Sequence, residues 1–192
     1  GDLVLLGSMS DSSTRAVDVR TGAVRWTYDP AATSAEVDSS YCMPLHELGP
    51  DGLPLPPQPG QGLPLLVCQW NAYDDDLGGW MASATTVEVL DPADGTVVSA
   101  LDGTANLLLD VQVRHGGLVV ASATLDGYVL ATRWSTDSWT PEWSYQSPEP
   151  LLGEGLSMLR GISSDNGVLR VEGQGVLALS LDTGREVPYA AE

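Results

Sequence analysis

The chain of 192 residues contains no phenylalanine and no lysine, a single isoleucine (Ile162) and only two cysteines. Its positive charge comes from arginine alone, and 26 acidic residues give a formal net charge of -18. A surface this negative repels phosphate groups, so we exclude nucleic acid as a partner and regard anionic membranes as poor partners. Cations, basic proteins or solubility alone remain as reasons for the charge.

Long hydrophobic runs are also missing. No apolar stretch approaches the roughly 18 residues that a membrane-spanning helix needs, and no signal peptide is visible. Hydrophobic residues nevertheless make up 43% of the chain, which is typical of a globular protein. We therefore expect a single globular domain over residues 1–192, processed or trimmed from a longer chain, with no membrane insertion in this segment.

What the sequence does contain is a repeated pattern of short strands and polar turns. Its clearest copy covers residues 4–28, where R-A-V-D-V-R-T-G is followed by A-V-R-W-T-Y. Weaker copies centre on residues 86–95 and 175–184, and a fourth at 122–134 keeps the strands but replaces the Thr-Gly turn. This pattern predicts strands at 3–7, 15–20, 23–28, 63–70, 86–90, 96–101, 107–114, 118–124, 128–134, 142–146, 168–172 and 176–181. A helical turn is expected only at 150–159.

The spacing of the repeats predicts the fold. Gly22, Gly95, the replaced turn near Asp137 and Gly184 are separated by about 73, 42 and 47 residues, and a four-stranded propeller blade takes roughly 40 to 50. The first interval therefore carries an insertion, rich in proline, at about residues 42–68. We predict an all-β fold, a β-propeller of four-stranded antiparallel blades with about four blades visible, as a partial or small propeller.

Cys42 and Cys68 flank the insertion. A disulfide between them would close a loop of about 27 residues and remove roughly 3.5 kcal/mol of unfolded-chain entropy. We expect this disulfide, and with it an extracytoplasmic location, either secreted or exposed in the cell envelope. Two free thiols in a cytosolic protein are the alternative. A zinc site is less favoured because only His46 lies nearby and no C-x-x-C is present.

Residues 16–26, A-V-D-V-R-T-G-A-V-R-W, resemble the repeat of the pyrroloquinoline-quinone-type (PQQ-like) β-propellers, small-x-Asp-x-x-Thr-Gly-x-x-x-Trp. The resemblance implies that Asp18, Thr21 and Gly22 form the turn between the last two strands of a blade. It also implies that Trp26 docks between neighbouring blades.

The other copies match this family pattern less completely. Asp182, Thr183 and Gly184 keep the turn residues but lack the tryptophan, and Ala100 stands near the tryptophan position of the second copy. In the copy at residues 122–134, the resemblance assigns the docking role to Trp143, which follows it.

Catalysis and cofactor binding are not expected. The quinoprotein dehydrogenases of the family hold their quinone and Ca²⁺ with adjacent cysteines, a stacked Trp and Glu, Asn and Asp ligands, and this chain has no adjacent cysteines. Asn71, Asp74 and Asp76 form a weak candidate Ca²⁺ site, with a solvated acidic turn as the other interpretation. No serine lies in a G-x-S-x-G motif, and His46 and His115 are expected at the surface.

Aromatic residues on loops are the candidate binding residues, since such residues anchor partners. We select Trp80 and Trp139, and with them Tyr73 and the acidic run Asp74, Asp75 and Asp76. A partner surface is predicted to combine the insertion with residues 71–80. The alternative is that the insertion only covers an open sheet edge.

We therefore expect a non-catalytic, extracytoplasmic binding or scaffolding module for a protein or other ligand, with a basic protein surface as the expected partner. Because few blades are visible, another chain could pair with this one to complete the propeller. The alternative is part of a quinoprotein dehydrogenase-like or glycosidase propeller enzyme whose active site lies in missing blades.

Overall fold

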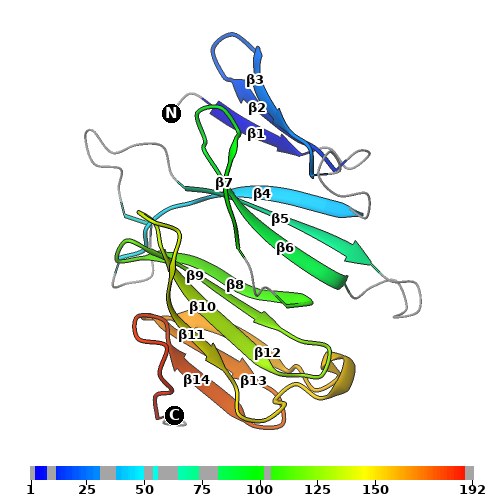
Figure 1. Ribbon diagram of the computed structural model, residues 1–192, viewed down its shortest axis with the longest axis vertical. Coiled ribbons are helices and arrows are strands. Elements are labelled where there is room, and N and C mark those ends of the chain that lie inside the picture. The colour runs from blue at the N-terminus through cyan, green and yellow to red at the C-terminus, as the bar shows by residue number, and fades with distance from the viewer. Residues whose placement is uncertain are drawn as a thin grey trace. The chain divides into compact units, whose positions relative to one another are not determined.

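The computed structural model describes residues 3–7, 12–30, 38–49, 54–55, 65–73, 82–101 and 105–188 (Figure 1). These residues form four antiparallel sheets, and the predicted all-β fold is confirmed. The 3-10 turn η3, Glu154–Leu156, falls inside the segment where a helical turn was expected. Among the described residues, no helix is long and apolar enough to cross a membrane.

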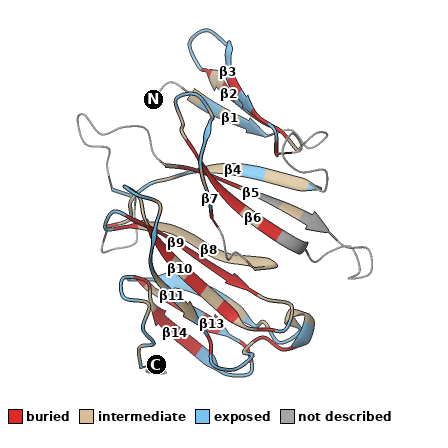
Figure 2. Cartoon of the chain, viewed as in Figure 1, coloured by how far each residue is buried: buried red, intermediate tan, exposed pale blue. Residues whose placement is uncertain are grey.

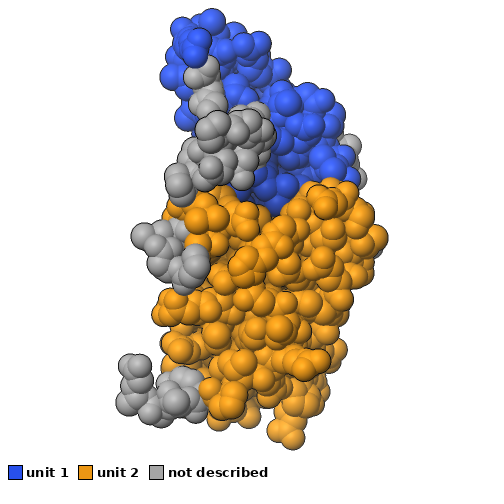
Figure 3. Space-filling view, turned by 90° about the vertical axis from the view of Figure 1, so that its left-hand side faces the viewer, with its two compact units in different colours: residues 1–45, 57–102 blue, residues 46–56, 103–192 orange. Residues whose placement is uncertain are grey.

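The chain divides into two compact units, residues 1–45 with 57–102 and residues 46–56 with 103–192 (Figure 3). Unit 1 holds two sheets. Sheet I consists of β1 (Leu3–Gly7), β2 (Thr14–Asp18) and β3 (Val24–Tyr28). Sheet II consists of β4 (Ser39–Leu45), β5 (Leu65–Tyr73), β6 (Ala82–Leu90) and β7 (Val97–Leu101).

Unit 2 holds the other two sheets, again with neighbouring strands in chain order. Sheet III consists of β8 (Leu107–Arg114), β9 (Gly117–Ala123), β10 (Val129–Ser135) and β11 (Pro141–Gln146). Sheet IV consists of β12 (Gly161–Asp165), β13 (Val168–Glu172) and β14 (Val176–Ser180). Every predicted strand has a counterpart, but β4 and β12 were missed. Pro44 interrupts the first, and the second is a short polar strand.

Each unit has its own hydrophobic core between its two sheets (Figure 2). In unit 1 the buried cluster consists of Ala16, Trp26, Tyr28, Leu66, Cys68 and Leu90. In unit 2 it is formed by alternate residues of β9, β10, β13 and β14, together with Leu152 and Leu181. One apolar face of each sheet is thus removed from water, as packed sheets require.

The predicted disulfide between Cys42 and Cys68 is confirmed. The two residues lie directly opposite each other in β4 and β5, and the strands continue pairing as far as Leu45 and Leu65. The cysteines therefore join two paired strands rather than the two ends of a loop. The connection that leaves this strand pair covers residues 46–64.

The first residues of this connection cover a sheet edge. Glu47 forms a parallel bridge with Val113 of β8, and the amide of Leu48 donates to the Val113 carbonyl at 3.2 Å. The amide of Leu55 in turn donates to the Glu47 carbonyl at 2.8 Å. Because β8 is an edge strand of sheet III, these contacts satisfy backbone groups at an open edge. They support the edge-covering alternative for this part of the insertion.

The same turn follows the second-to-last strand of sheets I, II and III, and in sheet IV it follows β14 and leads to the Leu179–Glu186 bridge. In each, the first residue donates its amide to the carbonyl five positions later and accepts the amide of the residue four positions later, at 2.8–3.0 Å. The first residues are Asp18, Asp91, Ser135 and Ser180. The fourth residue after each has a positive φ; these are Gly22 (71°), Gly95 (77°), Trp139 (53°) and Gly184 (65°). The third turn is therefore not replaced in structure, because Trp139 adopts the glycine conformation.

A tryptophan of one sheet lies on the turn glycine of the next sheet in both units. A Cβ on Gly95 would lie 2.7 Å from the Trp26 ring, and one on Gly184 would lie 2.6 Å from the Trp143 ring. The Trp26 indole also donates to the Pro92 carbonyl at 3.1 Å. These contacts agree with the docking role that the resemblance implied for both tryptophans.

The second sheet lacks this tryptophan. Trp26 pairs with Ala16, two residues before its turn, and the matching pair in sheet II is Val89 with Ser99. The residue at the docking position is therefore Ser99, the neighbour of Ala100, since Ser99 follows Gly95 by four residues as Trp26 follows Gly22.

Candidate binding surface

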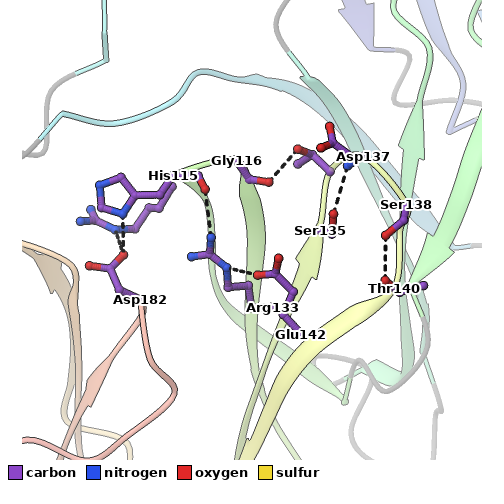
Figure 4. A network of polar contacts seen from close by, with 11 residues as sticks. His115, Gly116, Arg133, Ser135, Asp137, Ser138, Thr140, Glu142 and Asp182 are labelled. Atoms are coloured by element: carbon purple, nitrogen blue, oxygen red, sulfur yellow. Dashed lines mark hydrogen bonds and ion pairs between the residues drawn. The ribbon is translucent and has the colours of Figure 1, made fainter.

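Turns of sheets III and IV form a polar network at one end of unit 2 (Figure 4). In an antiparallel sheet, the β8–β9 and β10–β11 turns leave from the same end. The turn after β14 contributes Asp182, whose carboxylate meets side chains of the β8–β9 turn. The network thus joins three turns from two sheets.

Arg114 connects sheet III to sheet IV. Its Nε lies 3.3 Å from Oδ1 of Asp182, and its side chain is only 6% exposed. The guanidinium covers Gly167, where a Cβ would lie 2.6 Å from Nη2. His115 places Nδ1 3.2 Å from the same Asp182 oxygen. Sequence reasoning missed Arg114, because nothing in R-H-G-G indicates which distant carboxylate it meets.

Arg133 also forms an ion pair with a carboxylate, here within sheet III. Its Nε lies 2.5 Å from Oε2 of Glu142, and its Nη2 donates to the His115 carbonyl at 3.1 Å. The guanidinium also covers Gly117. Arg133 is therefore held within sheet III and Arg114 between sheets III and IV, while the side chains of Glu142 and Asp182 stay 43% and 39% exposed.

The β10–β11 turn is held firmly at this end. The hydroxyl of Thr136 donates to the Gly116 carbonyl at 2.7 Å, and the Ser138 and Thr140 hydroxyls lie 2.7 Å apart. The turn carries the exposed Asp137 and the half-buried Trp139. At this end, unit 2 therefore presents the partly exposed carboxylates of Glu142 and Asp182, each paired with an arginine, and the exposed Asp137 near Trp139. Such carboxylates can contact a cationic or basic ligand.

Most of the other predicted binding residues lie outside the described residues, namely Trp80, Asp74, Asp75 and Asp76. Tyr73 ends β5, and its side chain is not described. Asn71 belongs to a polar ladder in sheet II. Its Oδ1 accepts from Gln69 and Thr85 at 2.9 Å, and its Nδ2 donates to Ser39 at 3.3 Å. A Ca²⁺ role for Asn71 would therefore compete with these bonds.

Strand β5 separates the two stretches that were predicted to form one partner surface. The insertion rejoins the sheet at Leu65, and the acidic stretch leaves it at Tyr73. A strand of nine residues spans about 27 Å at the usual rise per residue. The two stretches therefore join opposite ends of β5, and most of their residues lie outside the described ranges, so the combined partner surface stays a prediction.

Asp18 and Asp182 have different roles, although both belong to the repeat. Oδ1 of Asp18 accepts the amides of Arg20 and Thr21 at 3.0 and 2.9 Å, and Arg25 lies 2.5 Å from Oδ2. The Arg25 guanidinium, together with the turn amides, lowers the pKa of Asp18 to about 2. In sheet IV the corresponding position is Ser180, so Asp182 binds across to the neighbouring sheet instead.

The carboxylate of Asp110 on β8 was also not identified from the sequence. Asp110 accepts hydrogen bonds from Ser164 of β12 and from Gln112, the latter at 2.8 Å. Burial raises the pKa of Asp110. Among the described ranges, no group of three or more His, Cys, Asp or Glu residues could hold a metal ion.

No protein-family model and no curated protein matches the sequence. Solved structures do match. Sqt1 from Saccharomyces cerevisiae is 13% identical with a TM-score of 0.54, covering 96% of this chain and 44% of that one. The computationally designed Ika8 protein is 15% identical with a TM-score of 0.51, covering 98% and 46%.

A quinohemoprotein alcohol dehydrogenase, ADHIIG from Pseudomonas putida HK5, is 14% identical with a TM-score of 0.50, covering 97% of this chain and 32% of that one. This chain spans less than half the length of each of these proteins. At such low identity the likeness concerns the fold alone. The chain has a β-propeller fold, with four blade-like sheets of three or four strands.

Proposed function

We propose that the chain is a non-catalytic, extracytoplasmic binding module of the PQQ-like propeller type. The Cys42–Cys68 disulfide supports the location, because disulfides persist mainly in oxidising compartments. The repeated turn and the docked Trp26 and Trp143 support the family type. The partner is a basic protein surface, which a net charge of -18 attracts and which added salt should release.

The observation that carries the proposal is the conformation of Trp139. Three equivalent turns have glycine at this position, and a bulky residue at positive φ costs roughly 1–2 kcal/mol. Strain of this kind is concentrated at functional sites. Trp139 lies beside the acidic Asp137 in a well-braced turn, so it combines an aromatic anchor with negative charge.

Replacement of Trp139 by glycine tests this role. The free energy of unfolding of the variant should equal that of the wild type or exceed it by about 1 kcal/mol, because glycine adopts the positive φ of this turn without strain. Its affinity for a deca-arginine peptide, measured by titration calorimetry at low salt, should fall about tenfold as one aromatic contact is lost. Asn166→Gly is the matched control, since Asn166 also has positive φ (49°) but carries no aromatic ring.

Two results would count against Trp139 as a binding residue. A loss of more than about 1 kcal/mol in stability would assign the side chain to the fold. Unchanged peptide affinity in the variant would assign binding to charge alone.

The enzyme alternative predicts that the chain binds a quinone cofactor and Ca²⁺. If the chain is a binding module, it should purify colourless and without stoichiometric Ca²⁺ by elemental analysis. Adding pyrroloquinoline quinone and Ca²⁺ should leave the quinone spectrum unchanged and give no alcohol-dependent dye reduction. A saturable spectral shift at one quinone per chain would overturn the non-catalytic proposal.

A further inference from the structure

The carboxylate of Asp110 joins the two sheets of unit 2. Asp110 belongs to β8, an edge strand of sheet III, and Ser164 belongs to β12, an edge strand of sheet IV. The Ser164 hydroxyl donates to Oδ2 of Asp110, and Nε2 of Gln112 donates to the same oxygen at 2.8 Å. A single carboxylate oxygen therefore connects the first strands of the two sheets.

Apolar residues surround this contact. Asp110 lies opposite Ala121 in sheet III, and Ser164 lies opposite Leu169 in sheet IV. Ala121 and Leu169 both belong to the hydrophobic core between these sheets, and Asp110 is half-buried at its margin. Burial outweighs the hydrogen bonds from Ser164 and Gln112, and it raises the pKa of Asp110.

The other titratable side chains of sheet III that share this face have partners of their own. The pairs are Arg114 with Asp182, Arg133 with Glu142 and Tyr145 with Glu186. Glu47 is bridged to Val113 of β8, which alternates with Gln112 and lies on the opposite face. Sheet III therefore directs no free charge at Asp110 from its described residues.

The described residues of sheet IV also place no charge against Asp110. The charged residues of β12 and β13 alternate with Ser164 and Leu169 and so lie on the opposite face; these are Asp165, Arg170 and Glu172. Arg160 precedes β12, four residues before Ser164, and is exposed. The described side chains that contact the Asp110 carboxylate are therefore both neutral.

We propose that the Asp110–Ser164 contact is a pH-sensitive latch between sheets III and IV, which tightens when the carboxyl group takes up a proton. A serine hydroxyl and a glutamine amide each offer a donor and an acceptor, so both can bond to either protonation state. The proton removes a charge that is costly beside an apolar core. The latch needs no partner, so it can hold even if the proposed function fails.

The direction of the effect follows from proton binding. Because the pKa of Asp110 is raised, the folded protein binds this proton more tightly than the unfolded chain does. The resulting stabilisation is complete below the ordinary aspartate pKa of about 3.9 and is lost as the pH rises through the folded value. Asp18 acts in the opposite direction, because its pKa is lowered to about 2.

Urea titrations of the wild type and of Asp110→Asn at about pH 7 and about pH 4 test the latch. Asparagine keeps an acceptor oxygen without the charge. At the higher pH the unfolding equilibrium constant of the variant should be lower than that of the wild type by about threefold or more, and at the lower pH the difference should shrink. Asp165→Asn is the matched control, because it removes one exposed charge from the other face of β12. It should show no such pH-dependent difference.

Amide hydrogen exchange reports on the latch locally. At about pH 7 the amides of β12 should exchange more slowly in Asp110→Asn than in the wild type, because sheet IV opens less often from sheet III. Amides of sheets I and II should exchange equally in the two proteins.

Ser164→Ala should act in the opposite direction. A hydroxyl bonds more strongly to an ionised carboxylate than to a neutral one, so its loss should raise the unfolding constant more at about pH 7 than at about pH 4. Ser163→Ala changes the neighbouring exposed residue and is the control. A carbon-13 NMR titration of the Asp110 carboxyl group in the wild type needs no variant. A midpoint at or below the ordinary aspartate value, or an Asp110→Asn variant no more stable than the wild type at about pH 7, would overturn the proposal.

Discussion

Replacing Trp26 with alanine is expected to lower the free energy of unfolding by about 3 to 5 kcal/mol. The side chain is 8% exposed, packs in the unit 1 core and donates its indole N–H to the Pro92 carbonyl. Its removal would leave a cavity between sheets I and II and an unsatisfied carbonyl. Urea titration followed by circular dichroism measures the change.

Two comparisons make this result specific. Thr27→Ala, on the exposed opposite face of β3, should change stability by less than about 0.5 kcal/mol. Gly95→Ala should destabilise more than Gly22→Ala, because both glycines have positive φ but only Gly95 lies under the Trp26 ring. A loss below about 1 kcal/mol for Trp26→Ala would show that the indole does not join the two sheets.

Removing the Cys42–Cys68 disulfide should cost roughly 3.5 kcal/mol in the chain-entropy account. The cysteines are 26 residues apart in sequence, and the bond joins neighbouring edge and central strands of sheet II. Its loss frees the unfolded chain across the whole insertion. The measurement compares urea unfolding of the oxidised protein with that of the Cys42→Ala, Cys68→Ala double variant.

The oxidised protein treated with reductant should unfold like the double variant, apart from the small packing effect of two missing sulfur atoms. Intact mass after alkylation without reductant should show no modified thiol in the wild type. Two alkylated cysteines, or a double variant as stable as the oxidised wild type, would contradict a stabilising disulfide.

Local signals in the sequence identified most of the fold. Alternating residues between turn signals located the strands, and Gly22, Gly95 and Gly184 marked three of the four repeated turns because glycine tolerates positive φ. Two strands were not predicted, because β4 contains a proline and β12 is polar. They form by pairing with β5 and β13. Pairing with a partner strand can override weak local preference.

The candidate site was less accessible from sequence. Trp139 was identified as a loop aromatic, but its glycine-like conformation follows from the hydrogen bonds of Ser135 and Thr140. The roles of Asp18 and Asp182 look the same in the repeat, although the turn begins at Ser180 in sheet IV. A one-dimensional pattern could not reveal the two-residue offset that turns Asp182 towards Arg114.

By itself, the sequence determined the all-β fold, the repeated turn, the paired cysteines and the two tryptophans that dock on neighbouring sheets. These features depend on periodicity, spacing and backbone preference, which are properties of short segments. Only the tertiary structure decided that Gly95 and Gly184 are covered by indoles while Gly22 is open. It also decided that Arg114 of sheet III meets Asp182 of sheet IV. Such facts depend on contacts between residues distant in the chain, and no local pattern encodes which faces of the sheets remain exposed.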